Sequence, residues 1–245
     1  MRKKFRIIYY INTGYPDFET SLKKAGEYLE HGACAIQFDL PSRKPYRETS
    51  FIKERMEETF RKYQTYKPFL ERLTAFRMQH PDFEMQMVSY EDVLLTIGTV
   101  NYIDFCKKNK IRTCRLAGDE NFEIARKDFN RAGIDTLTFI DYDMKDKDIE
   151  FALKTGRAVM LRNVREGMNP RESLTTWKAR IAFLRECGIT APIYATAGMK
   201  SADDIKEAQE GGADGAFIGS ALMKLWNDED ALWKLFNEMQ SICSE

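Results

Sequence analysis

Two polar residues interrupt an apolar run near the start of the chain, where they could carry acid–base chemistry. Gln37 and Asp39 lie within Ala35–Leu40, and side chains alternate along a strand, so both point to one face. Asp39 is therefore a candidate general acid or base, although it could equally cap a turn through its own backbone. Glu48 follows in a loop rich in arginine and lysine, where a catalytic carboxylate and a surface ion pair are both open.

Two glycine-containing turns near the end of the chain have the composition of an anion site. Gly198 and Met199 lie in the first turn, and Gly219 and Ser220 lie in the second; each turn follows an apolar run and precedes a helical pattern. Glycine lets backbone N–H groups approach a phosphate, and a helix that starts there points its positive end at the anion. Ser201 and Ser220 would add hydroxyl donors. The alternative is that the small residues merely permit tight turns.

Arginines interrupt two further apolar runs, Arg115 in Thr113–Ala117 and Arg162 after Leu161. A buried guanidinium is costly unless it meets an anion. The sequence leaves two kinds of partner open, an anionic substrate group and an internal carboxylate such as Asp39, Asp119 or Asp141. The segment Arg165–Pro170 contains the glycine, asparagine and proline expected of a lid loop, with Gly167 at its centre.

Eight short β-like runs alternate with helical patterns, which predicts a parallel sheet. The expected strands are Arg6–Ile11, Ala35–Leu40, Glu84–Ser89, Thr113–Ala117, Thr136–Ile140, Ala158–Leu161, Ile193–Ala197 and Gly215–Ile218. The expected helices are Glu19–His31, Lys53–Gln79, Val100–Asn109, Phe122–Ala132, Lys147–Thr155, Leu174–Cys187 and Ala202–Glu210. An open doubly wound sheet would have a glycine-rich turn after its first strand, but only Gly14 lies there. The pattern favours one (β/α)8 barrel.

Composition agrees with this fold class and excludes others. The 245 residues are enough for one barrel domain, which we expect to span 1–245. Lys plus Arg and Asp plus Glu are equal at 38 each, so the chain has no net positive charge that would favour binding of nucleic acid. No apolar stretch is long enough to cross a membrane. Five cysteines without paired spacing indicate reduced thiols, a cytoplasmic location and no metal site.

Several motifs together resemble the α subunit of tryptophan synthase over nearly the whole chain. They are the opening run Tyr9–Asp17, the segment His31–Pro45, and the turns at Gly167, Gly198 and Gly219–Lys224. The resemblance implies a (β/α)8 barrel and retro-aldol cleavage of indole-3-glycerol phosphate, which yields indole and glyceraldehyde 3-phosphate. It implies no cofactor, and it implies a β subunit as partner.

The chain departs from this family at positions that matter for catalysis. The family's acid/base glutamate falls on Gln37, and an amide cannot exchange a proton at neutral pH. The family's loop aspartate falls on Glu48, and its active-site tyrosine falls on Tyr90. The threonine before the loop glycine Gly167 is replaced by Glu166. The altered Pro41–Pro45 segment helps to bind the β subunit in the family, which weakens the case for that partner here.

These features leave three functional readings. The first is a lyase acting on indole-3-glycerol phosphate or a related phosphorylated substrate, with Asp39 or Glu48 replacing the lost acid/base group. The second is a catalytically inactive family member that binds a phosphate ester or a protein partner. A sugar-phosphate isomerase or epimerase is a weaker third, because many barrel enzymes share this phosphate site. We take the first as the prediction.

Overall fold

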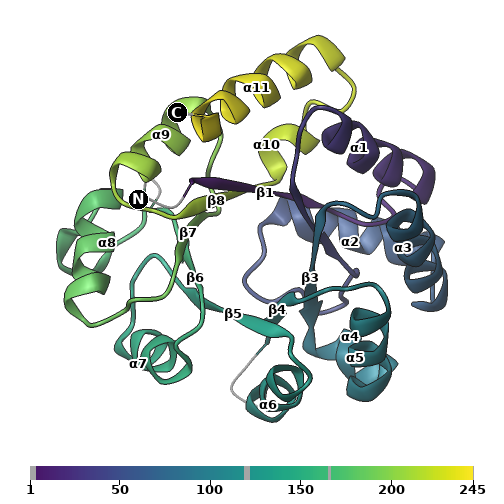
Figure 1. The fold of residues 1–245 in the computed structure, drawn as a ribbon, viewed down its shortest axis with the longest axis horizontal. Helices are drawn as coiled ribbons and strands as arrows, with labels where there is room; N and C mark the ends of the chain where they lie inside the picture. The colour runs from purple at the N-terminus through teal and green to yellow at the C-terminus, as the bar shows by residue number, and fades with distance from the viewer. Residues whose placement is uncertain (1–3, 119–121, 165–166, 245) are drawn as a thin grey trace. The chain divides into compact units, whose positions relative to one another are not determined.

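The computed structural model describes residues 4–118, 122–164 and 167–244. Its eight strands follow one another in a closed parallel barrel, in the order β1-β2-β3-β4-β5-β6-β7-β8, so the predicted (β/α)8 fold is confirmed (Figure 1). The strands are β1 (Arg6–Ile11), β2 (Ala35–Asp39), β3 (Glu84–Tyr90), β4 (Thr113–Ala117), β5 (Asp135–Ile140), β6 (Val159–Arg162), β7 (Ile193–Thr196) and β8 (Gly215–Ile218).

Helices follow each strand. Their bounds are α1 (Phe18–Glu30), α2 (Ser50–Lys62), α3 (Lys67–Gln79), α4 (Glu91–Ile97), α5 (Thr99–Lys108), α6 (Glu123–Arg131), α7 (Asp146–Thr155), α8 (Trp177–Glu186), α9 (Ala202–Glu210), α10 (Ser220–Met223) and α11 (Glu229–Ser241), with short 3-10 turns at Arg171–Ser173 and Ile242–Ser244. No helix in the described ranges is long and apolar enough to span a membrane.

The predicted single helix Lys53–Gln79 is wrong, because the structure divides it into α2 and α3. Pro68 lies in the first turn of α3, where its missing N–H costs nothing, whereas inside a continuous helix it would clash with the preceding turn. The expected helices did not include α4 or α11, although Gly98 ends α4 and the Asp228 side chain caps the start of α11.

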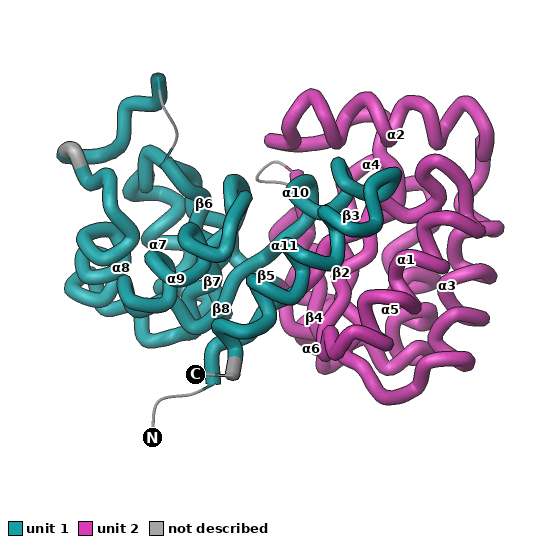
Figure 2. Tube along the Cα trace, turned by 90° about the horizontal axis from the view of Figure 1, so that it is seen from above, with its two compact units in different colours: residues 1–8, 137–245 teal, residues 9–136 magenta. Residues whose placement is uncertain are grey.

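The chain forms two compact units, unit 1 with residues 1–8 and 137–245, and unit 2 with residues 9–136 (Figure 2). Within unit 2, β2 pairs with β3 and β3 with β4 in parallel register. Tyr9 packs on Tyr28 of α1 and Phe38 packs on Phe76 of α3, with ring centroids 5.5 and 5.6 Å apart. Alternate residues on the same strands, including Asp39, therefore face the inside of the barrel.

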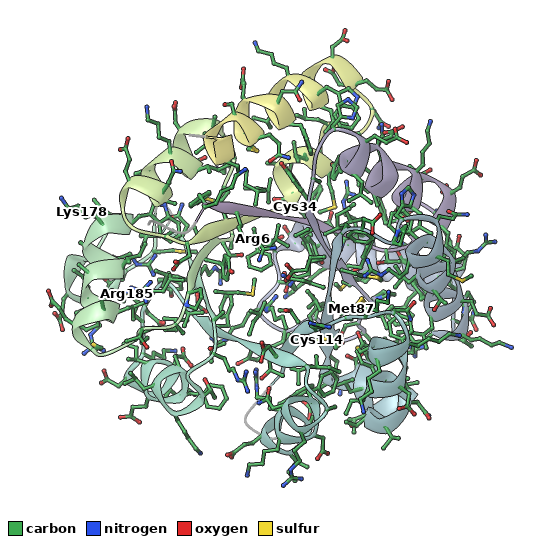
Figure 3. The ribbon with its side chains drawn as sticks, viewed as in Figure 1. Arg6, Cys34, Met87, Cys114, Lys178 and Arg185 are labelled. Atoms are coloured by element: carbon green, nitrogen blue, oxygen red, sulfur yellow. The ribbon has the colours of Figure 1, made fainter. Side chains whose placement is uncertain are left out.

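In unit 1, β8 begins at a close backbone approach. A methyl group at Gly215 would lie 2.3 Å from the carbonyl oxygen of Arg6 on β1, a residue labelled in Figure 3, and 2.9 Å from Cδ1 of Tyr194 on β7. Neighbouring strand backbone cannot move aside cheaply. Glycine is therefore required here for close packing.

Gly215→Ala is expected to lower the free energy of unfolding by about 1–3 kcal/mol, because the added methyl group overpacks the strand. Urea unfolding measures this. Gly26→Ala, within α1, is the matched control. Its added methyl group would lie 3.5 Å from the nearest atom, Nε2 of His80, which is ordinary van der Waals contact. Removing a mid-helix glycine should raise stability by up to about 1 kcal/mol. Equal effects of the two changes would contradict the close approach at Gly215.

Candidate active site

The Asp39 carboxylate, at the C-terminal end of β2, is the most enclosed acidic group of the site. The residue is 1% exposed. Its Oδ2 accepts hydrogen bonds from the Tyr10 hydroxyl and from Asn12 Nδ2, both at 2.6 Å, and its Oδ1 accepts one from the Thr13 backbone N–H at 2.8 Å. Three neighbours from β1 and the turn after it thus hold one carboxylate. The alternative that Asp39 caps a turn through its own backbone does not describe these bonds, because their donors are on residues 10–13.

Burial raises the pKa of Asp39 from 3.8 to about 6, even though the hydrogen bonds from Tyr10, Thr13 and Asn12 lower it. The nearby Glu48 charge adds to the increase. A carboxyl group with a pKa near the ambient pH can both take up and release a proton, which is the property of an efficient general acid–base group.

The Glu48 carboxylate lies in the loop after β2 and belongs to an ion pair that is largely buried. Its Oε1 accepts hydrogen bonds from Arg115 Nη1 of β4 at 2.7 Å and from the Tyr90 hydroxyl at the end of β3 at 3.1 Å. The side chains of Arg115 and Glu48 are 10% and 14% exposed. The internal-carboxylate alternative for Arg115 therefore holds, with Glu48 as the carboxylate; Asp119 lies outside the described residues.

The groups around the two carboxylates keep their protons. Burial raises the pKa of the Tyr10 and Tyr90 hydroxyls well above 10, and the neighbouring carboxylates add to the effect. Burial lowers the pKa of Arg115, but the Glu48 charge, the Tyr90 hydroxyl and the hydrogen bond to Glu48 together outweigh it, and the net change is upward. Both phenols are hydrogen-bond donors to carboxylates at neutral pH.

Gln37 lies two residues before Asp39 on β2, on the same inner face, and is 1% exposed. Its Nε2 approaches Oε1 of Gln86 on β3 at 3.4 Å, a long hydrogen bond between two amides. Gln86 in turn donates to Glu84 at 2.7 Å. The position that the resemblance assigns to the acid/base residue therefore holds a neutral side chain among neutral and polar neighbours.

The loop between Asp39 and Glu48 is tied to α4 by a carboxylate that sequence reasoning did not single out. Asp92 accepts hydrogen bonds from the Ser42 hydroxyl at 2.6 Å and from the Arg43 backbone N–H at 2.8 Å. The Tyr66 hydroxyl of the segment before α3 donates to the Pro41 carbonyl at 3.0 Å. These contacts fix the path of the loop that carries Glu48.

In unit 1, the turns after β7 and β8 hold the residues that the sequence predicts to bind an anion. Gly198 has φ +123°, a conformation that a side chain would oppose. Gly219 is the N-cap of α10 and forms no side-chain cap, and the half-buried Ser220 begins that helix. Met199 is 3% exposed as a whole residue. The exposed Gly167, with φ +78°, follows residues 165–166, which include Glu166 and lie outside the described ranges.

The Ser201 hydroxyl is not a free phosphate donor as the sequence suggested. It forms a capping box with Asp204 at the start of α9, donating to Oδ2 at 2.9 Å and accepting from the Asp204 N–H at 3.2 Å. The backbone N–H groups of Lys200 and Ser201 also donate to this carboxylate. The Ser-x-x-Asp spacing was the visible signal.

Arg162 of β6 pairs with Asp141 at 3.2 Å, which was one of the carboxylates named as possible partners. Beside them lies Arg180 of α8, which is 1% exposed and was not anticipated. Its guanidinium donates to the carbonyls of Arg162 and Tyr142 at 2.6 and 3.2 Å, and burial lowers its pKa to about 10. Arg180 thus joins the ends of β5 and β6.

Together these features define a parallel (β/α)8 barrel protein that carries a buried cluster of ionisable groups at the carboxyl ends of β2–β4. Among the described residues, no group of three or more histidine, cysteine, aspartate or glutamate side chains could hold a metal ion.

Comparison with known proteins gives the family. The family model described as "Tryptophan synthase alpha chain" matches residues 1–243, and the chain belongs to that family. The tryptophan synthase alpha chains of Shigella dysenteriae and Escherichia coli K12 are each 23% identical to it over 228 residues, covering 91% of this chain and 85% of the relative. At this identity the chain is a divergent member.

Solved structures agree with the fold. Tryptophan synthase subunit alpha from Legionella pneumophila superposes with a TM-score of 0.81 at 16% identity, covering 98% of this chain and 93% of that chain. A mutant tryptophan synthase α-subunit from Pyrococcus furiosus gives a TM-score of 0.79 at 19% identity over the full length of both chains.

Proposed function

We propose that this protein is a carbon–carbon lyase that cleaves indole-3-glycerol phosphate or a related phosphorylated substrate by a retro-aldol reaction, with Asp39 as the proton-transfer group. The observation that carries the proposal is the buried Asp39 carboxyl with a pKa of about 6. It lies on the same inner face as Gln37, two residues further along β2, so the function lost at Gln37 has an ionisable neighbour to replace it.

Asp39 can account for both proton transfers of the reaction. As a carboxylate it removes the proton from the hydroxyl group on the carbon that becomes the aldehyde. The carbon–carbon bond then breaks, and its electron pair stays with the leaving carbon. The Asp39 carboxylic acid returns the proton to that carbon, which regenerates the carboxylate and leaves two products, one of them glyceraldehyde 3-phosphate with its phosphate charge unchanged.

Other residues bind and orient the substrate in this proposal. Glu48, held by Tyr90 and Arg115, accepts a hydrogen bond from the leaving portion through its second oxygen. Gly198, Met199, Gly219 and Ser220 supply backbone N–H groups and a hydroxyl group to the phosphate, as barrels do after their last two strands. A β-type subunit remains a proposed partner, testable by co-purification with a family β subunit.

The test is whether the purified protein releases glyceraldehyde 3-phosphate from indole-3-glycerol phosphate. A coupled dehydrogenase assay measures the release. Turnover supports the lyase.

A second candidate is a non-catalytic protein that binds a phosphate ester, favoured by the neutral Gln37 and by the pairing of Glu48 with Arg115. Phosphate-dependent binding without product from any phosphorylated substrate would select that candidate.

The pH dependence of turnover is a separate prediction. Because the base form of Asp39 is required and its pKa is about 6, kcat/KM should rise about tenfold per pH unit below pH 6 and level off above it. The measurement is kcat/KM between pH 4.5 and 8 in buffers of constant ionic strength. A limb near pH 4 would instead point to a carboxylate in an ordinary environment.

Gln37→Glu is expected to raise kcat for indole-3-glycerol phosphate by about 10-fold or more, since it restores a second ionisable group. Replacing the buried amide of Gln37, a residue that is 1% exposed, by a carboxyl group should also lower the stability, because a buried charge is penalised. Single-turnover assays and thermal unfolding measure the two effects. Gln79→Glu, on the exposed surface of α3, is the control and should change neither. Unchanged turnover in Gln37→Glu would mean that Asp39 does not need a partner at that position.

A further inference from the structure

We propose that the portion of the substrate bound by β1–β4 is rich in hydroxyl or amino donors, as in a sugar-type phosphate ester, and not an apolar indole ring. This deepens the proposed function and rests on it for turnover, while its binding test is independent.

The side chains that face the inside of β1–β4 are predominantly polar. In register, Tyr10 lies beside Gln37, Gln37 beside Gln86 and Gln86 beside Thr113; in the next layer, Asp39, Val88 and Arg115 are neighbours. Val88 is the single apolar side chain among these seven. Barrel interiors are ordinarily filled by branched apolar residues, so a polar lining indicates a polar occupant.

Acceptor capacity remains in this lining. The Tyr10 and Tyr90 hydroxyls each donate their one hydrogen to a carboxylate. Both hydrogens of the Asn12 amide are used as well, toward Asp39 and the Tyr10 oxygen. Asn12 is 2% exposed, and its Oδ1 accepts no hydrogen bond within the described chain. The amide orientation is set by the carboxylate, because a flipped amide would turn its oxygen toward Asp39.

Two acceptor groups carry the proposed ligand chemistry. Asn12 Oδ1 and the second oxygen of Glu48 are acceptors, so the complementary ligand carries O–H or N–H groups. An indole ring carries one N–H donor. It would leave the other polar groups of the lining buried without hydrogen-bond partners, and this costs binding free energy. A polyol chain supplies several donors. The predicted preference is therefore a polyol phosphate over an indole phosphate of similar length.

Binding of two uncleavable probes, sorbitol 6-phosphate and indole-3-propanol phosphate, tests this by calorimetry on the full-length protein. Sorbitol 6-phosphate is expected to bind at least about tenfold more tightly, the size of one satisfied hydrogen bond. Tighter binding of the indole probe overturns the proposal. Binding of both probes no tighter than inorganic phosphate overturns it too.

A variant separates the lining from general effects on the barrel. Gln86→Leu keeps the side-chain volume and removes one polar group, so it should shift the ratio of the two affinities toward the indole probe by about threefold or more. Gln79→Leu, on the exposed surface of α3, is the matched control and should leave the ratio unchanged. A Gln86→Leu ratio equal to that of the unmodified protein counts against the proposal.

Activity assays distinguish failure of this inference from failure of the proposed lyase. Fructose 6-phosphate and indole-3-glycerol phosphate are supplied separately, and glyceraldehyde 3-phosphate is the product measured in both. Cleavage of the indole ester alone refutes the polar substrate class and leaves the lyase standing. Preferential binding of sorbitol 6-phosphate without any cleavage supports the substrate class and refutes the lyase.

Discussion

Asp39→Asn is expected to reduce kcat for glyceraldehyde 3-phosphate release by about 10²–10⁴, the usual contribution of a general acid–base group. An amide has the same shape as the carboxyl group but cannot transfer a proton at neutral pH. KM should change little, because Asp39 touches Tyr10, Asn12 and Thr13 through bonds that position the carboxylate and not the phosphate. The measurement is steady-state kinetics at pH 7.5, with circular dichroism to verify folding.

Two comparisons make this result specific to Asp39. Asp104→Asn removes an exposed carboxylate from α5 and should retain full activity. The residual activity of Asp39→Asn should also lose the limb near pH 6, since the group that titrates there is gone. Retained activity with an intact limb would move the proton-transfer role to another group, with Glu48 the first to examine.

The barrel could be predicted from sequence because its signals are local. Apolar runs of four to six residues alternate with helical patterns, and the strand bounds found for β1, β4 and β8 are those expected. The same alternation placed Gln37 and Asp39 on one face. The division of Lys53–Gln79 was also readable, since Pro68 cannot occupy the interior of a helix.

The contacts that tune the candidate site could not be predicted, because they join distant parts of the chain. The partner of Arg115 is Glu48, 67 residues earlier, and three carboxylates had been equally reasonable choices. The raised pKa of Asp39 depends on its complete burial, which depends on how the barrel packs. Tyr10 and Asn12 had a readable signal, because their spacing repeats that of Gln37 and Asp39.

Breaking the Arg115–Glu48 pair is expected to have the largest effect on stability. Arg115→Met keeps much of the aliphatic volume but leaves Glu48 without its cation, and removing one member of a buried pair costs about 3 kcal/mol. Both side chains are about nine-tenths buried, so solvent compensates little for the lost Nη1 to Oε1 contact of 2.7 Å. Urea unfolding at neutral pH measures the change. Arg112→Met, exposed just before β4, is the control and should shift stability by less than about 0.5 kcal/mol.

The double variant Glu48→Gln/Arg115→Met separates the cost of an unpaired charge from the value of the pair itself. With both charges removed, the desolvation penalty of an isolated carboxylate disappears, so the double variant should be more stable than Arg115→Met alone. Part of the loss should remain, because the Tyr90 hydroxyl then donates to an amide oxygen in place of a carboxylate. Equal stability of Arg115→Met and the control would place this pair among surface ion pairs, which contribute little. A double variant less stable than either single change would show instead that the ion pair, and not the burial of its members, holds the loop carrying Glu48 against β3 and β4.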